Sequence, residues 1–297
     1  MSDILIREAA VHSAVPTVVE EAPAPARRRG PRDVLKHIWL GASVVVLLLA
    51  LGFALFPSVF ASGDPLVGTP ADKLQAPSAS HWFGTDNIGR DVFTRVVHGS
   101  GLSLTATLLA VGIALVVGSI IGLVSGAVGG VVDAVLMRIV DVLLSIPTLL
   151  LSLALVTALG FGTVNVAIAV GVTLIANFAR VMRSEVLRVR RSLYVEAAYA
   201  SGVRWFDVFR RHILRNSYGP VIALAAVEFG MAVLAVSALS FLGFGAAPPT
   251  PEWGSLISEG RNFLATAWWM TTLPGLVIVA VVVSAHRLGH ALERRSQ

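Results

Sequence analysis

The chain has 297 residues, of which 55% are hydrophobic and only 14% are charged, and its mean hydropathy is +0.78. Soluble domains carry roughly 25% charged residues, so this composition excludes an ordinary water-soluble domain and indicates an all-α, polytopic membrane protein. The net charge of +5 is attributed to segments on the cytoplasmic side of a membrane rather than to nucleic-acid binding. The sequence contains no cysteine, which excludes disulfides, thiol catalysis and cysteine-ligated metals.

Apolar runs of about 20 residues, long enough to cross a hydrocarbon layer as helices, recur along the chain. Residues 1–36 precede them and are predicted to form a disordered cytoplasmic tail, because they are rich in Ala, Pro and Val. Residues 37–100 hold the first transmembrane helix and a polar external loop, and residues 101–297 hold the transmembrane core. Six spans are predicted, at about 37–59, 102–124, 132–159 with an interruption at Pro147, 163–178, 218–244 and 268–285.

The distribution of positive charge orients these spans. Of the 23 lysine and arginine residues, all but Lys73, Arg90, Arg95 and Arg261 fall on the side of the two termini. Positive residues concentrate in cytoplasmic segments, so both termini are expected in the cytoplasm. The loops at 61–100 and 245–267 are then expected outside.

The most basic segment, residues 180–216, interrupts the apolar pattern between the fourth and fifth spans. Residues 185–196 and 205–214 carry apolar side chains at helical spacing with arginines between them, which predicts two short amphipathic helices. Gly202 stands between them, where a turn with a positive φ angle suits glycine. Two interpretations stay open: the helices rest on anionic membrane lipid, or they pack against another protein. The small pair at 197–198 favours protein contact.

The residues of this segment resemble the EAA loop of bacterial ABC importer permeases. The matching residues are Glu196, Ala197 and Ala198, then Gly202, then His212-Ile213-Leu214. Further segments resemble the dipeptide/oligopeptide/nickel subgroup in its second permease subunit, the OppC/DppC type of binding-protein-dependent transport inner membrane component. They are FGTDNIGRDVFTR at 83–95, LSFLGFG at 239–245, Pro248-Pro249, Trp253-Gly254 and Pro274-Gly275. The resemblance covers about residues 32–292. Arg215 departs from it, because the family has proline there, and Val236 and His290 depart as well.

The resemblance implies a type I ABC importer permease fold in the bacterial inner membrane, forming half of a translocation path for peptides. A nickel complex is the alternative substrate. The implied partners are a second permease subunit in a heterodimer, one or two ATP-binding subunits and an extracytoplasmic solute-binding protein. ATP and Mg²⁺ are expected on the ATP-binding subunits, because this sequence has no Gly-x-x-x-x-Gly-Lys-[Ser/Thr] segment. The chain itself is therefore expected to hold no cofactor and to be no enzyme.

Two groups of site residues follow from the resemblance. The residues implied to contact the ATP-binding subunit are Glu196, Ala197, Ala198, Gly202, Arg204, Asp207, His212 and Leu214. Those implied to lie on the side of the solute-binding protein are Asp86, Asn87, Gly89, Arg90 and Asp91.

Two acidic residues within the predicted spans are candidates for the translocation path. Charged groups at membrane depth tend to face a cavity or each other. Asp141 and Glu228 therefore either line the substrate path and bind a cationic amine, or form contacts between helices. For Asp141 a position close to the cytoplasmic interface, paired with Arg138 three residues earlier on the same helix, is favoured, and for Glu228 both interpretations stay open.

Small residues recur every four positions in the second span, at Gly118, Gly122 and Gly126. This spacing predicts close packing against another helix.

Candidate residues for a metal site and for a hydrolase site also occur in the sequence. His81, Asp86, Asp91 and His98 are spaced too loosely to favour a metal site, and turns with internal ion pairs are the better interpretation of residues 86–91. Ser100, close to His98, superficially resembles a nucleophile with its base. An intramembrane hydrolase is therefore the alternative from a different functional class.

Overall fold

A computed structural model describes residues 31–296 of the chain, and within this range it consists of helices and the loops that join them. Residues 1–30 of the predicted tail lie outside the described range. The structure starts at helix α2 (Pro31–Leu55), so the last residues assigned to the tail belong to a helix instead. The described residues confirm the prediction of an all-α fold.

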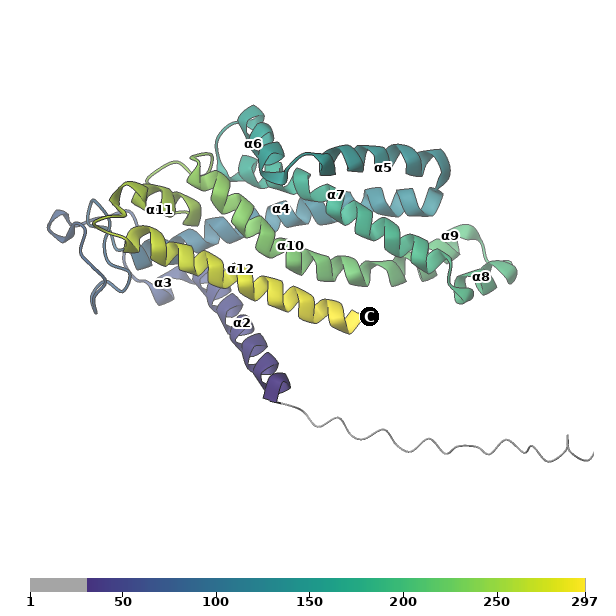
Figure 1. Ribbon diagram of the computed structural model, residues 1–297, viewed down its shortest axis with the longest axis horizontal. Helices are drawn as coiled ribbons and strands as arrows, with labels where there is room; N and C mark the ends of the chain where they lie inside the picture. The colour runs from purple at the N-terminus through teal and green to yellow at the C-terminus, as the bar shows by residue number, and fades with distance from the viewer. Residues whose placement is uncertain (1–30, 297) are drawn as a thin grey trace, which may run out of the picture. The chain divides into compact units, whose positions relative to one another are not determined.

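Five described helices or helical runs are long and apolar enough to cross a membrane (Figure 1). They are α2, α4 (Val92–Val128), α7 (Thr163–Arg190), α10 (Arg215–Phe241) with the turns before it, and α12 (Trp269–Ser296). The predicted third span is broken into α5 (Gly130–Ser145) and α6 (Thr148–Leu159), which are bent by 96°. The break falls at Pro147, as predicted, because proline has no N–H to continue the helix.

Two helices extend beyond the apolar runs that predicted them. Helix α4 begins ten residues before the expected start, because the Asp91 side chain caps it by accepting a hydrogen bond of 2.7 Å from the Thr94 amide. Helix α7 continues to Arg190, past the predicted end near 178. Charged side chains end an apolar run, but they do not end a helix.

Helix α7 packs along α4 through the predicted glycine stripe. A Cβ atom built at Gly118 would lie 2.6 Å from the Ile175 carbonyl oxygen, and one at Gly126 would lie 2.7 Å from the Val186 side chain. At Gly122 it would overlap the Ala179 carbonyl oxygen. This confirms that the stripe permits close helix packing.

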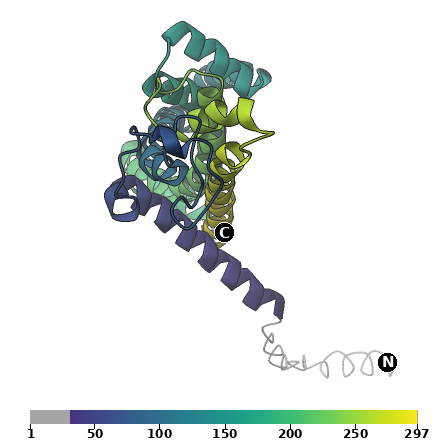
Figure 2. The ribbon, with the colours of Figure 1, turned by 90° about the vertical axis from the view of Figure 1, so that its left-hand side faces the viewer.

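The two ends of the bundle formed by residues 38–296 differ in structure (Figure 1). Helices α8 (Leu193–Ala200) and α9 (Trp205–Val208) lie at one end, and α11 (Trp253–Gly260) lies at the other, beside the loop that precedes α4. Figure 2 shows this loop from its own end, with α11 next to it. Helix α11 was predicted as loop. Arg287 of α12 lies 4.8 Å from the centre of the Trp39 ring of α2, so these parts of the first and last spans share one end.

Candidate functional site

The elbow between α8 and α9 is built around Gly202. Its φ angle is +78°, which confirms the predicted turn. The Gly202 amide donates to the Tyr199 carbonyl and the Val203 amide donates to the Ala198 carbonyl, at 3.0 and 3.2 Å. These two bonds are the Schellman arrangement that closes a helix with a left-handed residue. A Cβ at Gly202 would meet nothing within 4 Å, so the backbone angle alone selects glycine here.

The α8–α9 elbow is anchored from beneath and apolar on its outer side. Val195, Val208 and Ile213 are buried in the same core cluster as the end of α7. The outer side carries a group of exposed large apolar side chains, here called the coupling patch. Its members are Leu193, Tyr194, Tyr199, Val203, Trp205 and Phe206. An exposed apolar patch of this kind marks a surface that contacts another protein or a membrane.

The residues of the predicted EAA motif lie on and around this patch. Glu196 and Ala197 are exposed and Ala198 is half-buried, so the acidic residue and its small neighbour face outward. Arg204 is exposed and immediately precedes α9, in an extended conformation. The structure therefore brings these four residues together around one elbow.

The remaining motif residues lie on the second arm of the elbow. Asp207 is 4.0 Å from Arg211 one turn later. The His212 ring lies 6.1 Å from the ring of Tyr194, and this contact ties α8 to the second arm. Leu214 is half-buried and ends a π-helical turn, Phe209–Leu214.

The predicted helix boundaries of this segment are wrong in one place and open in another. A single helix was expected at 185–196, but α7 ends at Arg190 and α8 starts anew at Leu193. The end of the second arm was left open, because Arg215 stands where the family has proline. In the structure α9, the π-helical turn and α10 form one helical run from Trp205 to Phe241. Arg215 has an amide N–H, unlike proline, and the helix passes through it.

Asp141 is paired with a residue that the sequence did not indicate. Its Oδ1 accepts a hydrogen bond of 2.8 Å from Arg180 on α7, so the expected pair with Arg138 is wrong. Both side chains are more than half exposed, at 57% and 58%. The Arg180 side chain reaches across to α5 because α5 and α7 pack against each other.

Glu228 lies in the interior, on α10. It is 8% exposed, and its Oε1 accepts a hydrogen bond of 2.9 Å from the Asn177 side-chain amide on α7. This geometry favours a helix–helix contact over an open position on a path. Asn177 is a polar residue within an apolar run, and this was the signal that sequence reasoning missed.

A second polar junction holds the other end of α7, and sequence reasoning missed it entirely. Arg183 donates two hydrogen bonds to Asp133 on α5, from Nε and NH2 at 2.5 and 2.6 Å. Ser125 of α4 donates to the same carboxylate. Arg190 donates to the carbonyls of Gly126 and of the next residue, at 2.6 and 3.1 Å. These contacts join the α4–α5 turn to the part of α7 that leads into the elbow.

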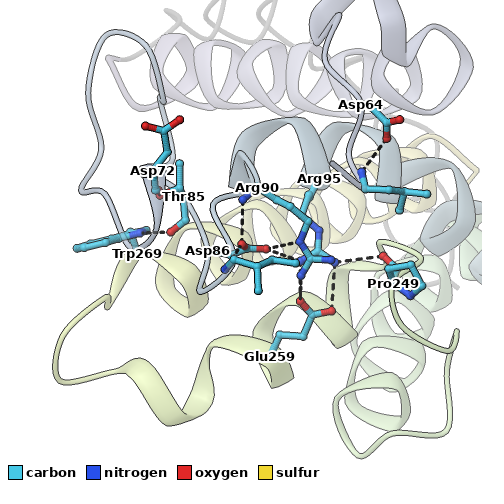
Figure 3. Close-up of polar contacts among 11 residues, drawn as sticks. Asp64, Asp72, Thr85, Asp86, Arg90, Arg95, Pro249, Glu259 and Trp269 are labelled. Atoms are coloured by element: carbon cyan, nitrogen blue, oxygen red, sulfur yellow. Dashed lines mark hydrogen bonds and ion pairs between the residues drawn. The ribbon is translucent and has the colours of Figure 1, made fainter. Parts of the chain in front are cut away.

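At the opposite end, four charged residues form a cluster in which Glu259 is half-buried and the other three are buried (Figure 3). Asp86 Oδ2 accepts from Arg90 Nε at 2.6 Å and from Arg95 at 3.1 Å. Both oxygens of Glu259 accept from Arg95, at 2.6 and 3.1 Å, and Arg90 donates to Glu259 at 2.9 Å. Arg95 also donates to the Pro249 carbonyl at 3.3 Å. We call Asp86, Arg90, Arg95 and Glu259 the outer cluster. It joins the loop before α4 to α11.

This cluster decides which of the predicted binding-protein residues are accessible. Asp86, Gly89 and Arg90 are buried. Asn87 is exposed. Asp91 is half-buried, because it caps α4 and lies 3.0 Å from His81. The expected turns and internal ion pairs of this segment are confirmed, and Gly89 has a φ angle of +85°.

The serine and histidine weighed as a hydrolase pair do not contact each other. Ser100 is fully buried and donates to the Val97 carbonyl at 2.6 Å. The ring of His98 is 3.0 Å from the Thr94 carbonyl. Both groups satisfy the backbone of their own helix.

A buried carboxylate near the C-terminal end of α10 was also not predicted from the sequence. Glu252 is 1% exposed and accepts from the Ser240 hydroxyl and the Ala246 amide, both at 2.7 Å. Its neighbour Trp253 donates to Ser103 and Val96 on α4, at 3.0 Å each. These bonds fix the start of α11 against α4 and α10.

Comparison with known sequences and structures gives a consistent picture. Residues 115–297 match the family model described as "Binding-protein-dependent transport system inner membrane component". The dipeptide transport system permease protein DppC of Alkalihalophilus pseudofirmus is 39% identical over 253 residues, covering 84% of this chain and 83% of that protein. The probable D,D-dipeptide transport system permease protein DdpC of Escherichia coli is 40% identical over 250 residues, covering 84% of each.

More distant matches cover more of the chain or show the fold alone. The glutathione transport system permease protein GsiD of Pectobacterium atrosepticum is 33% identical over 288 residues, covering 96% of this chain and 95% of that protein. A chain of the inward-facing MetNI methionine ABC transporter superposes with a TM-score of 0.57, covering 68% of this chain and 96% of that one, at 16% identity.

Proposed function

The chain belongs to the family of binding-protein-dependent transport system inner membrane components, and we propose that it is the permease subunit of an ATP-driven importer for peptides. Two of the relatives are named for dipeptide transport and one for glutathione transport, and glutathione is itself a peptide. The chain crosses the membrane several times and contributes half of the translocation path. Both of its termini face the cytoplasm, in agreement with the distribution of arginines.

The coupling patch carries this proposal. It stands beyond the end of the α7 span, it is apolar and exposed, and it is held on a rigid elbow with an acidic residue at its edge. A cytoplasmic ATP-binding subunit is the occupant proposed for it. ATP and Mg²⁺ then bind to that subunit. The complex contains one or two ATP-binding subunits. This chain supplies the mechanical contact and no catalytic group.

Movement of the elbow reaches the membrane along two routes. The run Trp205–Phe241 is one continuous helical rod from the patch into the span. The contacts of Arg183 and Arg190 join the α4–α5 turn to the part of α7 that leads into the elbow. A push on the patch therefore moves α10 through the helical run, and moves α7 together with the α4–α5 turn. Of the two acidic path candidates, the exposed Asp141 faces the path, and the buried Glu228 holds α7 to α10.

Two further partners complete the proposed assembly. A second permease subunit forms the other half of the path in a heterodimer. An extracytoplasmic solute-binding protein docks at the end that holds the loop before α4 and α11, where Asn87 is exposed. Nucleic acid is no partner in this proposal.

The test of coupling uses Gly202 and a matched control. Gly202→Val forces a β-branched residue into a left-handed conformation at a cost of about 1–2 kcal/mol, so the elbow loses its shape. Gly202→Asn keeps the conformation, because asparagine tolerates it. The complete complex in proteoliposomes is assayed for peptide uptake and for ATP hydrolysis stimulated by the binding protein. We expect Gly202→Val to lose both while staying in the membrane, and Gly202→Asn to keep most of both.

Glu196→Ala provides an independent variant of the same surface. Its side chain is exposed, so its loss leaves folding intact while removing an ion pair with the ATP-binding subunit. We expect weaker recovery of the ATP-binding subunit when the permease is affinity-purified. Full uptake by both Gly202→Val and Glu196→Ala, at normal expression, would refute the docking role of the elbow.

A further inference from the structure

The exposed side of α7 differs from that of the other spans. Exposed positions on α4, such as Leu108, Val116 and Ile120, carry large apolar side chains, as expected for contact with lipid tails. Along α7, all of which the structure describes, Val164 is the single large apolar side chain that is exposed. The other exposed side chains of α7 include three polar residues four positions apart, which therefore share one face. They are Arg180, Ser184 and Arg188.

Arg180 is the first of these three residues and lies where α7 leaves its apolar run. It is ten residues before the end of α7 at Arg190, or about 15 Å along the helix axis at 1.5 Å per residue. Its ion pair with Asp141 is more than half exposed on both sides. Charged groups are costly against lipid, so an exposed ion pair on a spanning helix is expected to face water. This face of α7 therefore borders the aqueous path.

The Arg180–Asp141 pair is also the most weakly held of the arginine contacts along this part of α7. Arg183 donates two hydrogen bonds to Asp133, and Arg190 donates to two backbone carbonyls. Arg180 donates one hydrogen bond, from one terminal nitrogen to one carboxylate oxygen. A guanidinium has five N–H donors and a fork that matches a carboxylate. Arg180 therefore keeps the capacity to bind a second carboxylate.

We propose that Arg180 is an exchange site for the terminal carboxylate of the translocating peptide, with Asp141 as its resting partner. This inference rests on the proposed function. As the peptide passes, its carboxylate replaces Asp141 on the guanidinium, and Asp141 returns when the peptide leaves. The number of ion pairs on Arg180 stays the same through the exchange, so its guanidinium is never left unpaired. A site of this kind binds well enough to admit the substrate and weakly enough to release it, as conduction requires.

The experiment compares a peptide with its C-terminal amide, which lacks the carboxylate. Uptake of dialanine and of dialanine amide is measured in proteoliposomes holding the complete complex, at saturating concentrations of loaded binding protein. The quantity of interest is the ratio of the two uptake rates, compared between wild type and variants. Because the same binding protein serves every variant, its own preference cancels in this comparison.

Arg180→Gln tests the site, and Arg188→Gln is the matched control. Arg188 lies two turns later on the same face and forms an exposed ion pair of 2.6 Å with Glu185 on its own helix. We expect Arg180→Gln to lower the preference for the free carboxylate by at least about tenfold, the loss of one charge-assisted hydrogen bond. Arg188→Gln is expected to keep the wild-type ratio. If both variants keep that ratio, the inference is overturned.

Asp141→Asn distinguishes the exchange of carboxylates on Arg180 from a role of Asp141 in merely positioning Arg180. It keeps Arg180 and removes its resting partner, so the peptide carboxylate stays bound longer. We expect slower uptake of dialanine and unchanged uptake of the amide, and this readout serves equally if Arg180→Gln fails to assemble. Equal loss of both substrates in these variants would place the residues in a subunit contact and overturn the inference. Failure of the wild-type complex to take up either compound would overturn the proposed function with it.

Discussion

The outer cluster and the ion pairs of α7 are made from the same residue types at opposite burial. In the outer cluster, the side chains of Arg95 and Asp86 are 2% and 1% exposed and each contacts more than one partner. On α7, Arg180 and Arg188 are 58% and 63% exposed and each contacts a single carboxylate. Buried charges must stay paired, whereas exposed ones are replaceable by water or another ion. The outer cluster therefore serves structure, and the α7 pairs are available for function.

The largest effect is expected from the outer cluster itself. Arg95→Ala leaves the two carboxylates of Asp86 and Glu259 with the single guanidinium of Arg90, and breaking a buried pair costs about 3–5 kcal/mol. We expect the free energy of unfolding in detergent to fall by this amount. Arg261→Ala is the control, because Arg261 is exposed next to α11. An equal loss in the two variants would show that the outer cluster contributes nothing beyond an ordinary surface charge.

An intermediate effect is expected at Arg183, whose side chain is 32% exposed and which holds Asp133 with two short bonds. Arg183→Gln removes charge-assisted bonds at a cost of about 2 kcal/mol. This variant is expected to lower both the unfolding free energy and the coupling of ATP hydrolysis to uptake, because Arg183 joins α7 to the α4–α5 turn. A loss of stability with coupling unchanged would show that the Arg183–Asp133 pair stabilises the fold and has no role in coupling.

The smallest effect is expected at Arg188. Exposed ion pairs contribute about 0.2–1 kcal/mol and are screened by salt. Arg188→Gln should therefore leave the unfolding free energy within this range of wild type, and the small difference should vanish at 1 M salt. A loss comparable to that of Arg95→Ala would contradict the division of the two regions by burial.

Sequence reasoning located several features correctly because each rests on local properties. Apolar runs indicated the spans, since about 20 apolar residues are required to cross a membrane in any context. The glycine stripe at 118–126 indicated close packing, and Gly202 indicated a left-handed elbow. The backbone angle at Gly202 is set by neighbouring bonds, so a short stretch of sequence suffices to indicate it.

Other features were missed because they depend on distant segments. Asp141 was assigned to its neighbour on the same helix, while its partner is Arg180 on another. Glu259 lies 164 positions from Arg95, and no spacing rule connects the two. The end of α7 was placed too early, because charge was taken as the end of the span.

The sequence by itself determined that this protein is a multi-pass helical membrane protein of a recognisable transport family with a glycine elbow. The spans follow from composition and periodicity, which any segment carries with it, and the family follows from the resemblance of the motifs. The tertiary structure alone decided which charges are buried and which remain open, because burial depends on what packs against a side chain. It thereby separated Arg95, held in a closed cluster, from Arg180, which one exposed carboxylate holds on the face of α7.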